Sequence, residues 1–312
     1  MLLPIAIFVF GLILLLICTE ILVKNAETLA YKLKLSPLIV GLTIVAIGTS
    51  IPELIVSTFA SVNHDYGLAL GNIVGSNIVN ILLILPIAIL LGKLRVGTVK
   101  TQRSTIVILL ITLLFFTLHK LNTSPPLVGI VLLTCAIIAT SLEYLWGIEG
   151  RDHEDHTRVS HNISKPFGIH NILLLIGALV GVSIGGMVLV QTTELFSEIF
   201  GLSTSILGLS LTAIATSLPE LLTTIFSQNE HDDKLTIGNI IGSNIYNLAL
   251  IGGVISFFNT GFDLNYKNWL WFLGATMILA LILWFNKGKA IPKYIGVCLL
   301  LGFILYMFFL AM

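Results

Sequence analysis

The sequence predicts an all-α membrane protein in which ten transmembrane helices form two inverted five-helix repeats. Three observations indicate this fold class. Of the 312 residues, 56% are hydrophobic and only 10% are charged, whereas a soluble domain carries about 25% charged residues. The apolar residues fall into stretches long enough to cross a bilayer, and one pair of motifs occurs twice with the same spacing. Most of the outer surface is therefore expected to face lipid.

The expected spans each have the length of about 20 residues that a bilayer requires. In chain order they cover residues 2–23, 36–61, 67–91, 104–119, 125–146, 168–195, 203–228, 235–258, 267–285 and 291–311. The first lacks a basic start and a small-residue cleavage site, so it is expected to be a retained span. All lysines and arginines except Lys120 and Lys267 lie in alternate connections, on one side of the membrane. The positive-inside rule then predicts that both termini are non-cytoplasmic.

The connection formed by residues 147–167 is rich in charge and divides the chain into a first repeat, 1–146, and a second repeat, 168–312. It is expected to be a solvated cytoplasmic linker loop, with a weak regulatory cation site as the alternative. The chain as a whole has 16 basic and 16 acidic residues, so no charge excess favours nucleic acid as a partner. The three cysteines show no paired spacing, which excludes a disulfide framework.

The internal repeat is carried by two motifs. GLTIVAIGTSIPEL at 41–54 recurs as GLSLTAIATSLPEL at 208–221, and GNIVGSNIVN at 71–80 recurs as GNIIGSNIYN at 238–247. Both recur 167 residues later, so the blocks 36–86 and 203–253 are two copies of one segment. Because each copy belongs to an odd number of spans, the second copy must enter the membrane from the opposite side. Inverted repeats of this kind commonly build secondary transporters with a site near the midplane.

Glu53 and Glu220 are the most informative residues of the two blocks. A carboxylate near the bilayer centre costs about 2.5–3.5 kcal/mol on insertion scales and usually marks a function. Each acid directly follows a proline, Pro52 or Pro219, which removes a helix hydrogen bond and frees carbonyl groups one turn earlier. A buried structural acid would explain neither the duplication nor the neighbouring proline. Both acids are therefore predicted to bind a ligand.

Oxygen-bearing residues surround these acids at helical spacing. Glu53 shares its helix face with Ser50, Thr49 and Ala46. Glu220 shares its helix face with the equivalent residues Ser217, Thr216 and Ala213. In the following spans one face carries Asn72, Ser76 and Asn80, and Asn239, Ser243 and Asn247. Such oxygen donors suit hard cations such as Ca²⁺ or Na⁺ and do not suit soft metals. Asn77 and Asn244, on another face, are expected to pack helices together.

GTSIPE with GNIVGSNIVN, and ATSLPE with GNIIGSNIYN, resemble the two alpha repeats of the cation/calcium exchanger superfamily, most closely its prokaryotic sodium/calcium exchanger branch. The resemblance implies exchange of Ca²⁺ against several Na⁺ by alternating access, at sites between the second, third, seventh and eighth spans. It implies that Glu53 and Glu220 share Ca²⁺ with the carbonyls of Thr49 and Thr216. The Na⁺ ligands that it implies are Ala46, Ser50, Ser76, Ala213, Ser217 and Ser243, with Asn80 and Asn247 at the centre.

Two features bear on which ions are exchanged. Potassium-dependent relatives are expected to have Asp where this chain has Asn247, so K⁺ co-transport is not expected. Proton-coupled relatives carry an additional acid where this chain has Ser76 and Ser243, which favours Na⁺. A proton-coupled Ca²⁺ antiporter of the same fold stays the alternative, and a cation channel a further one. Because two carboxylates neutralise one Ca²⁺, exchange for more than two Na⁺ would move net charge and make transport electrogenic.

The remaining expectations concern context. The protein is expected not to be an enzyme and to need no cofactor. Its expected partners are the transported ions and the lipid bilayer, with no nucleic acid and no obligatory protein partner, and its location is a prokaryotic plasma membrane. Glu27 and Glu194 occupy equivalent repeat positions, and a role in lining the mouth of the pathway stays open for them. Glu20 and Glu143 have no counterpart in the other repeat and are expected to make local hydrogen bonds or to reach the membrane surface.

Overall fold

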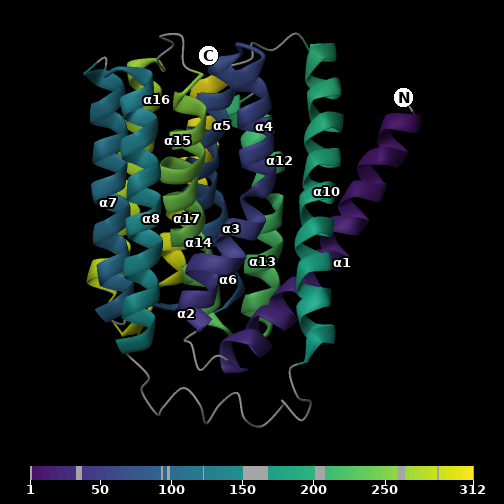
Figure 1. Cartoon of the computed structure of the whole chain (residues 1–312), viewed down its shortest axis with the longest axis vertical. Coiled ribbons are helices and arrows are strands. Elements are labelled where there is room, and N and C mark those ends of the chain that lie inside the picture. Colours follow the sequence, from purple (N-terminus) through teal and green to yellow (C-terminus); the bar gives the residue numbers. More distant parts are fainter. Residues whose placement is uncertain are drawn as a thin grey trace.

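A computed structural model describes residues 2–32, 37–92, 94–96, 99–121, 123–149, 168–200, 208–258, 264–286 and 288–311 of the chain. These residues form a bundle of helices whose long axes run roughly side by side (Figure 1). Eight helices in these ranges are long and apolar enough to cross a membrane, or up to ten if each of two bent pairs counts as one span. The protein is therefore an all-helical, multi-pass membrane protein.

The helices of the first half agree with the expected spans to within a few residues, except that the first helix is longer. Their bounds are α1 (Leu2–Lys32), α2 (Pro37–Val40), η1 (Gly41–Val45), α3 (Ala46–Thr49), α4 (Ile51–Val62), α5 (Tyr66–Val79), η2 (Asn80–Ile84), α6 (Leu85–Leu91), α7 (Val99–Lys120) and α8 (Pro125–Glu149). The segments η1 and η2 are π-helical.

The second half repeats this order. Its helices are α10 (Ile169–Phe200), η3 (Gly208–Thr212), α12 (Ala213–Thr216), α13 (Leu218–Asn229), α14 (Asp233–Tyr246), η4 (Asn247–Ile251), α15 (Gly252–Ser256), α16 (Tyr266–Phe285) and α17 (Lys293–Ala311). The segments η3 and η4 are again π-helical. Every bound from the start of η1 to the end of η2 recurs 167 residues later, which is the offset of the sequence motifs.

Two helix pairs, one in each half of the chain, are broken at equivalent places. The chain bends by 42° between α3 and α4 and by 46° between α12 and α13. Ser50 and Ser217 occupy the breaks, and a proline follows within the first two positions of the next helix. Proline is tolerated there because the first turn of a helix needs no N–H donor. In Figure 1 the chain rises from α2 to α4 but descends from α12 to α13, so the two broken spans run in opposite directions.

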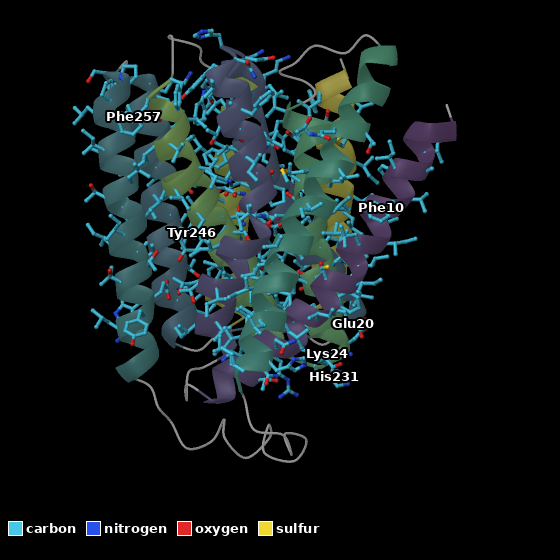
Figure 2. All side chains as sticks on the ribbon, turned by 45° about the vertical axis from the view of Figure 1, so that its right-hand side comes forward. Phe10, Glu20, Lys24, His231, Tyr246 and Phe257 are labelled. Atoms are coloured by element: carbon cyan, nitrogen blue, oxygen red, sulfur yellow. The ribbon has the colours of Figure 1, made fainter. Side chains whose placement is uncertain are left out.

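Burial separates central helices from peripheral ones. The membrane segments that begin with α5 and α14 are 83% and 89% buried, whereas the segments in α17 and α1 are only 17% and 28% buried. Side chains such as Phe10 on α1 project outward from the bundle (Figure 2), where 62% of Phe10 is exposed. This distribution leaves the outer helices facing lipid and encloses α5 and α14, which carry the asparagine motifs.

The turns that precede α5 and α14 are also equivalent. His64 and His231 have positive φ angles of 64° and 60°. Asp65 and Asp232 then cap the following helices, because their carboxylates accept the backbone N–H groups of Leu68 and Leu235 at 3.0 and 2.9 Å. Side-chain caps of this kind satisfy backbone donors that have no partner inside the helix.

Some features differ from the expectations or fall outside the described residues. Two short strands, β1 (Arg95–Val96) and β2 (Lys289–Ala290), pair antiparallel, with Arg95 opposite Ala290. A strand of only two residues gives no recognisable pattern in a sequence. Residues 150–167 of the linker lie outside the described part of the chain, as do the side chains of Glu27 and Glu194.

Candidate cation-binding site

The two predicted acids lie in the first turns of the helices that follow the breaks. Glu53 is in the first turn of α4 and Glu220 in the first turn of α13, and their side chains are 0% and 1% exposed. The first turn of a helix stabilises a negative charge, because its free N–H groups and the helix dipole point at the side chain. The fold therefore provides a partial compensation for burying each carboxylate.

Each acid is bound by the serine from the other repeat. The Ser50 hydroxyl donates to Glu220 Oε1 over 3.1 Å, and the Ser217 hydroxyl donates to Glu53 Oε1 over 3.3 Å. The second oxygen of each carboxylate, Oε2, is buried and has no hydrogen-bond partner among the described residues. Because a buried polar atom normally has a partner, these two oxygens are candidate cation ligands.

The threonines make a second pair of contacts between the repeats. The Thr49 hydroxyl lies 3.3 Å from Asn239 Oδ1, and the Thr216 hydroxyl donates to Asn72 Oδ1 over 3.1 Å. Both pairs are related by the same exchange of 167 residues as the serine–glutamate pairs. The sequence spacing puts Asn72 and Asn239 on the same helix faces as the candidate ligand serines. Their contacts with the threonines of the other half could not be predicted from the sequence, because they depend on how the halves pack together.

The two predicted serines of α5 and α14 differ in their contacts. Ser76 Oγ lies 3.3 Å from the hydroxyl of Thr216. Ser243, its counterpart, is fully buried, and its hydroxyl has no hydrogen-bond partner within the described ranges. The site is therefore not perfectly symmetric in this conformation.

Ala46 and Ala213 can contribute only their carbonyl groups. The carbonyl of Ala46 accepts the N–H of Ser50 at 3.1 Å, and that of Ala213 accepts the N–H of Ser217 at 3.1 Å. Each carbonyl also accepts a threonine hydroxyl, from Thr49 at 3.4 Å or from Thr216 at 3.3 Å, so a cation at either carbonyl would replace that hydroxyl contact. The structure places both residues two turns before the acids, at the starts of α3 and α12.

Asn80 and Asn247 begin the π-helical segments η2 and η4. Their side chains are 1% and 0% exposed, and the oxygen and nitrogen atoms of both amide groups have no partner among the residues that the structure describes. π-Helical turns are rare and occur frequently at functional sites. Asn77 and Asn244 differ in that their amide nitrogens donate to the carbonyls of their own helices at 2.8 and 2.6 Å, although their Oδ1 atoms also have no partner among the described residues.

Glycines allow the helices of the two repeats to approach closely. A Cβ atom at Gly75 would lie 2.8 Å from Ala213 Cβ and 2.9 Å from the backbone of Leu209. A Cβ atom at Gly242 would lie 2.7 Å from Ala46 Cβ and 2.6 Å from the Leu42 carbonyl oxygen. These two contacts are again related by the exchange of repeats, and they bring α5 and α14 against the backbones that carry the candidate carbonyl ligands.

The donor set of the site consists of oxygen atoms. Carboxylates, hydroxyls, amide oxygens and backbone carbonyls are the ligands that Ca²⁺ and Na⁺ prefer. Within the described ranges, no group of three or more His, Cys, Asp or Glu residues is placed to hold a metal ion. The arrangement therefore suits weakly held hard cations, which bind and leave, better than a permanently bound transition metal.

Comparison with known proteins agrees with this chemistry. The family model described as "Sodium/calcium exchanger protein" matches residues 3–144 and 170–312, which together cover most of the chain. The chain belongs to the sodium/calcium exchanger family. The two matched segments are separated by the charged linker, so each half of the chain matches the family separately.

Relatives of similar length match over nearly the whole chain. The sodium/calcium exchanger MaX1 of Methanosarcina acetivorans is 30% identical over 96% of both chains, and the putative antiporter CaxA of Alkalimonas amylolytica is 32% identical over 96% of both. A solved structure of the sodium-calcium exchanger NCX_Mj, soaked with Na⁺ and Sr²⁺, has 27% sequence identity and a TM-score of 0.80, with 97% of both chains covered. The fold is thus that of a known exchanger of this family.

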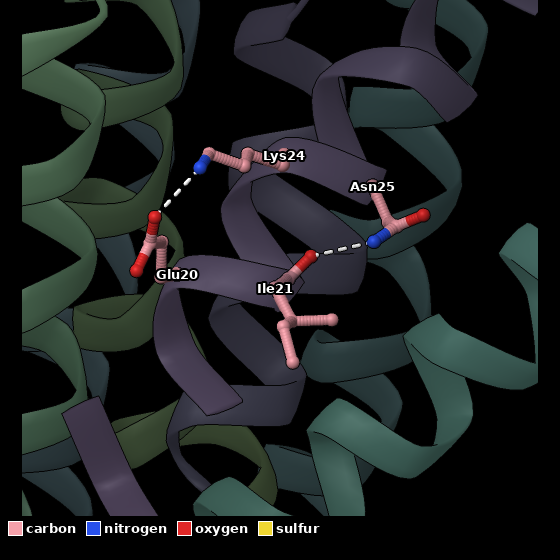
Figure 3. Close-up of polar contacts among 4 residues, drawn as sticks. All are labelled: Glu20, Ile21, Lys24 and Asn25. Carbon is pink, nitrogen blue, oxygen red and sulfur yellow. Dashed lines mark hydrogen bonds and ion pairs between the residues drawn. The ribbon is translucent and has the colours of Figure 1, made fainter. Parts of the chain in front are cut away.

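Glu20, one of the two acids of α1, makes a local contact. The carboxylate of Glu20 accepts a hydrogen bond from the Lys24 ammonium at 2.6 Å (Figure 3). The side chain of Glu20 is 47% exposed and that of Lys24 is 58% exposed. Near them the Asn25 amide donates to the carbonyl of Ile21 at 2.8 Å. Exposed pairs of this kind contribute little to stability. Glu20 is therefore a local surface acid.

Proposed function

We propose that the protein exchanges Ca²⁺ for Na⁺ across the membrane by alternating access. The observation that carries the proposal is the pair of buried carboxylates, Glu53 and Glu220, each with one oxygen bound by the other repeat's serine and one oxygen without a partner among the described residues. Family membership and the ions named for NCX_Mj support the same ion pair as substrates. The protein is accordingly a transporter and not an enzyme.

In the proposed site Ca²⁺ binds between Glu53 and Glu220, with the carbonyls of Thr49 and Thr216 as further ligands. The proposed Na⁺ ligands are the carbonyls of Ala46 and Ala213, the hydroxyls of Ser50, Ser217, Ser76 and Ser243, and the amides of Asn80 and Asn247. The unpartnered oxygens of Asn80, Asn247 and Ser243 support this assignment. Because the serines bind the acids directly, an ion that displaces one serine contact also changes the environment of the opposite carboxylate.

The charge of the two acids supports obligatory exchange. Two carboxylates neutralise one Ca²⁺, so the loaded centre can reorient with little net charge. Without cations the centre would carry two buried negative charges, which is unfavourable within a membrane. If more than two Na⁺ replace one Ca²⁺, each cycle moves net charge, and the membrane potential contributes about 2.3 kcal/mol per charge per 100 mV. Transport is therefore proposed to be electrogenic.

The proposal includes ten spans arranged as two inverted repeats, residues 1–146 and 168–312, joined by a cytoplasmic linker, 147–167. Three findings support it: the recurrence of element bounds after 167 residues, the opposite directions of the two broken spans, and the reciprocal contacts at the site. The distribution of lysine and arginine supports the further proposal that both termini are non-cytoplasmic, in a prokaryotic plasma membrane.

The test is uptake of radioactive Ca²⁺ into proteoliposomes loaded with Na⁺. Wild-type uptake is expected to require internal Na⁺, and both Glu53→Gln and Glu220→Gln are expected to abolish it. Glu20→Gln is the matched control, because it removes an exposed acid of α1 and is expected to leave uptake unchanged. Uptake driven equally well by a pH gradient without Na⁺ would instead establish proton coupling. Conduction without any counter-ion would establish a channel.

A further inference from the structure

Glu143 is a buried acid that lies outside the cation-binding site. It belongs to α8, an outer helix whose membrane segment is only 28% buried. The neighbouring Tyr144 and Leu145 are 52% and 54% exposed, yet Glu143 is only 3% exposed. Glu143 continues the buried stripe of Ala136 and Ala139 at helical spacing. Its carboxyl group therefore points into the protein and does not reach the membrane surface.

The surroundings of Glu143 leave it partly unpartnered. The hydroxyl of Ser104, which is fully buried on α7, makes a hydrogen bond to the Glu143 side chain. The other carboxyl oxygen, Oε1, has no hydrogen-bond partner among the described residues. The hydrogen bonds of Glu143 therefore do not form the fully satisfied network that would be expected of a purely structural buried acid.

Tyr246 connects this region with the cation-binding site. Its hydroxyl lies 3.0 Å from Thr140 Oγ1, and Thr140 donates its single proton to the Ala136 carbonyl at 2.8 Å. The Tyr246 hydroxyl must therefore donate to Thr140. Glu143 lies one helical turn beyond Thr140 on α8, so it is a near neighbour of this contact along the helix. Figure 2 shows Tyr246 between the ends of the bundle that Phe257 and His231 mark.

The ligand that fits Glu143 is a proton and not a metal cation. The cation-binding site has two acids and broken helices, whereas Glu143 is a single acid on a continuous helix, Pro125–Glu149. The carbonyl groups around it are engaged inside that helix, so few oxygen ligands are left for a metal. An isolated ionised carboxylate within a membrane is costly, and protonation removes that cost without any further ligand.

The other titratable or charged groups near Glu143 are few among the described side chains. On α7, the Arg103 guanidinium lies 5.5 Å from the centre of the Trp146 ring, while His119 and Lys120 lie at the opposite end of that helix. On α14 the group that faces α8 is Tyr246. The remaining elements packed against α8, namely α2, η1, η4 and α15, contain no titratable residue.

We propose that Glu143 binds a proton and that its protonation state controls ion exchange through Tyr246. The control of ion exchange rests on the proposed function. When Glu143 loses its proton to water, the resulting carboxylate is a stronger hydrogen-bond acceptor than the Thr140 hydroxyl. The Tyr246 hydroxyl then turns from Thr140 to Glu143. Tyr246 ends α14 and Asn247 begins η4, so the change takes place at the residue that precedes the candidate ligand.

The coupling acts on one repeat only. The residue equivalent to Tyr246 in the first repeat is Val79, which has no hydroxyl group. Protonation of Glu143 therefore changes the surroundings of Asn247 and leaves those of Asn80 as they are. A proton can in this way alter the rate of one step of the cycle without being a transported ion.

Infrared spectroscopy of the purified protein tests whether Glu143 binds a proton. The difference spectrum between wild type and Glu143→Gln is expected to contain the carbonyl band of a protonated carboxyl group at neutral pH, and that band is expected to disappear as the pH rises. Glu20→Gln serves as the control, because an exposed acid is ionised at neutral pH and its replacement removes no such band. A Glu143→Gln difference spectrum without the band at neutral and lower pH would overturn the proposal.

Transport measurements test the control of exchange. Protons that compete at Glu53 and Glu220 raise the Ca²⁺ concentration needed for half-maximal uptake, so the maximal rate at saturating Ca²⁺ isolates the effect of Glu143. In wild type this maximal rate is expected to change with pH. Glu143→Gln is expected to hold it at the wild-type low-pH value, and Tyr246→Phe to remove its pH dependence while the infrared band persists.

A Glu143→Gln variant whose maximal rate follows pH as in wild type would refute the control by this acid. A merely structural role would change the yield or stability of the variants without removing the pH dependence. If the wild type showed no Na⁺-dependent Ca²⁺ flux, the proposed function would fail, while the infrared measurement would still decide whether Glu143 binds a proton.

Discussion

Replacement of Gly242 by alanine tests the close packing between the repeats. The added Cβ atom would lie 2.6 Å from the Leu42 carbonyl oxygen, 2.9 Å from Leu42 Cα and 2.7 Å from Ala46 Cβ. Normal contacts between carbon atoms lie at about 3.5–4.0 Å. None of these three atoms belongs to a flexible side chain, so the clash cannot be relieved by a rotamer change. The helix α14 must instead move away from η1 and α3.

The magnitude follows from the cost of overpacking. Extra methyl groups in a well-packed core cost about 1–3 kcal/mol, which corresponds to a roughly 5- to 160-fold change in the unfolding equilibrium at 25 °C. We expect a loss of transport beyond this loss of stability, because the movement also displaces the backbone of Ala46, a candidate ligand. The folded fraction of purified Gly242→Ala in detergent and its Ca²⁺ uptake per folded molecule measure the two effects separately.

Gly274→Ala is the matched control for this experiment. Gly274 also lies in a membrane-spanning helix, α16, but a Cβ atom there would meet nothing within 4 Å. We expect Gly274→Ala to be as stable as wild type and fully active. If Gly242→Ala matched this control in both stability and uptake, the inferred close contact between α14 and the broken span would be wrong.

Three further predictions concern other contacts of the described residues. Ser50→Ala and Ser217→Ala should each raise the internal Na⁺ concentration that half-maximal Ca²⁺ uptake requires by a factor of about 10, because each removes a proposed hydroxyl ligand of Na⁺. Uptake at varied internal Na⁺ measures this, and Ser141→Ala, which removes an exposed hydroxyl bonded to its own helix, should have no effect. Asn247→Leu should raise the free energy of unfolding by about 1–3 kcal/mol, because it removes a buried amide without partners among the described residues. The same variant should lose Ca²⁺ uptake, and unchanged uptake would exclude Asn247 as a ligand. Asp232→Ala should cost about 1 kcal/mol of stability through loss of a helix cap, and thermal unfolding that does not shift would contradict that role.

Much of the fold could be predicted because its signals are local or repeated. Apolar stretches of sufficient length locate the spans, and Pro52 and Pro219 locate the breaks to within two residues. The π-helical segments could not be predicted, because the extra residue in each depends on packing between distant helices. No residue type in GLTIV or NILLI distinguishes a π-helix from an α-helix.

The candidate site shows a similar division. The duplicated motifs single out Glu53, Glu220 and their hydroxyl-bearing neighbours, because oxygen donors are rare in lipid-facing segments. They do not indicate that Ser50 contacts Glu220, since pairing across repeats depends on how the two halves dock. Glu143 carries no repeat signal, and its interest arises only from its burial and from its position beside Tyr246.

The reciprocal contacts have a consequence for the origin of the protein. Each acid depends on a serine supplied by the other half, so one half alone contains no complete site. An ancestral chain of half this length would have had to assemble as an antiparallel homodimer, with one subunit inserted in each orientation. In a single chain the two halves are always present in equal number and are free to differ, as Val79 and Tyr246 do. Two separately expressed halves should accordingly restore exchange only when both are present in one membrane.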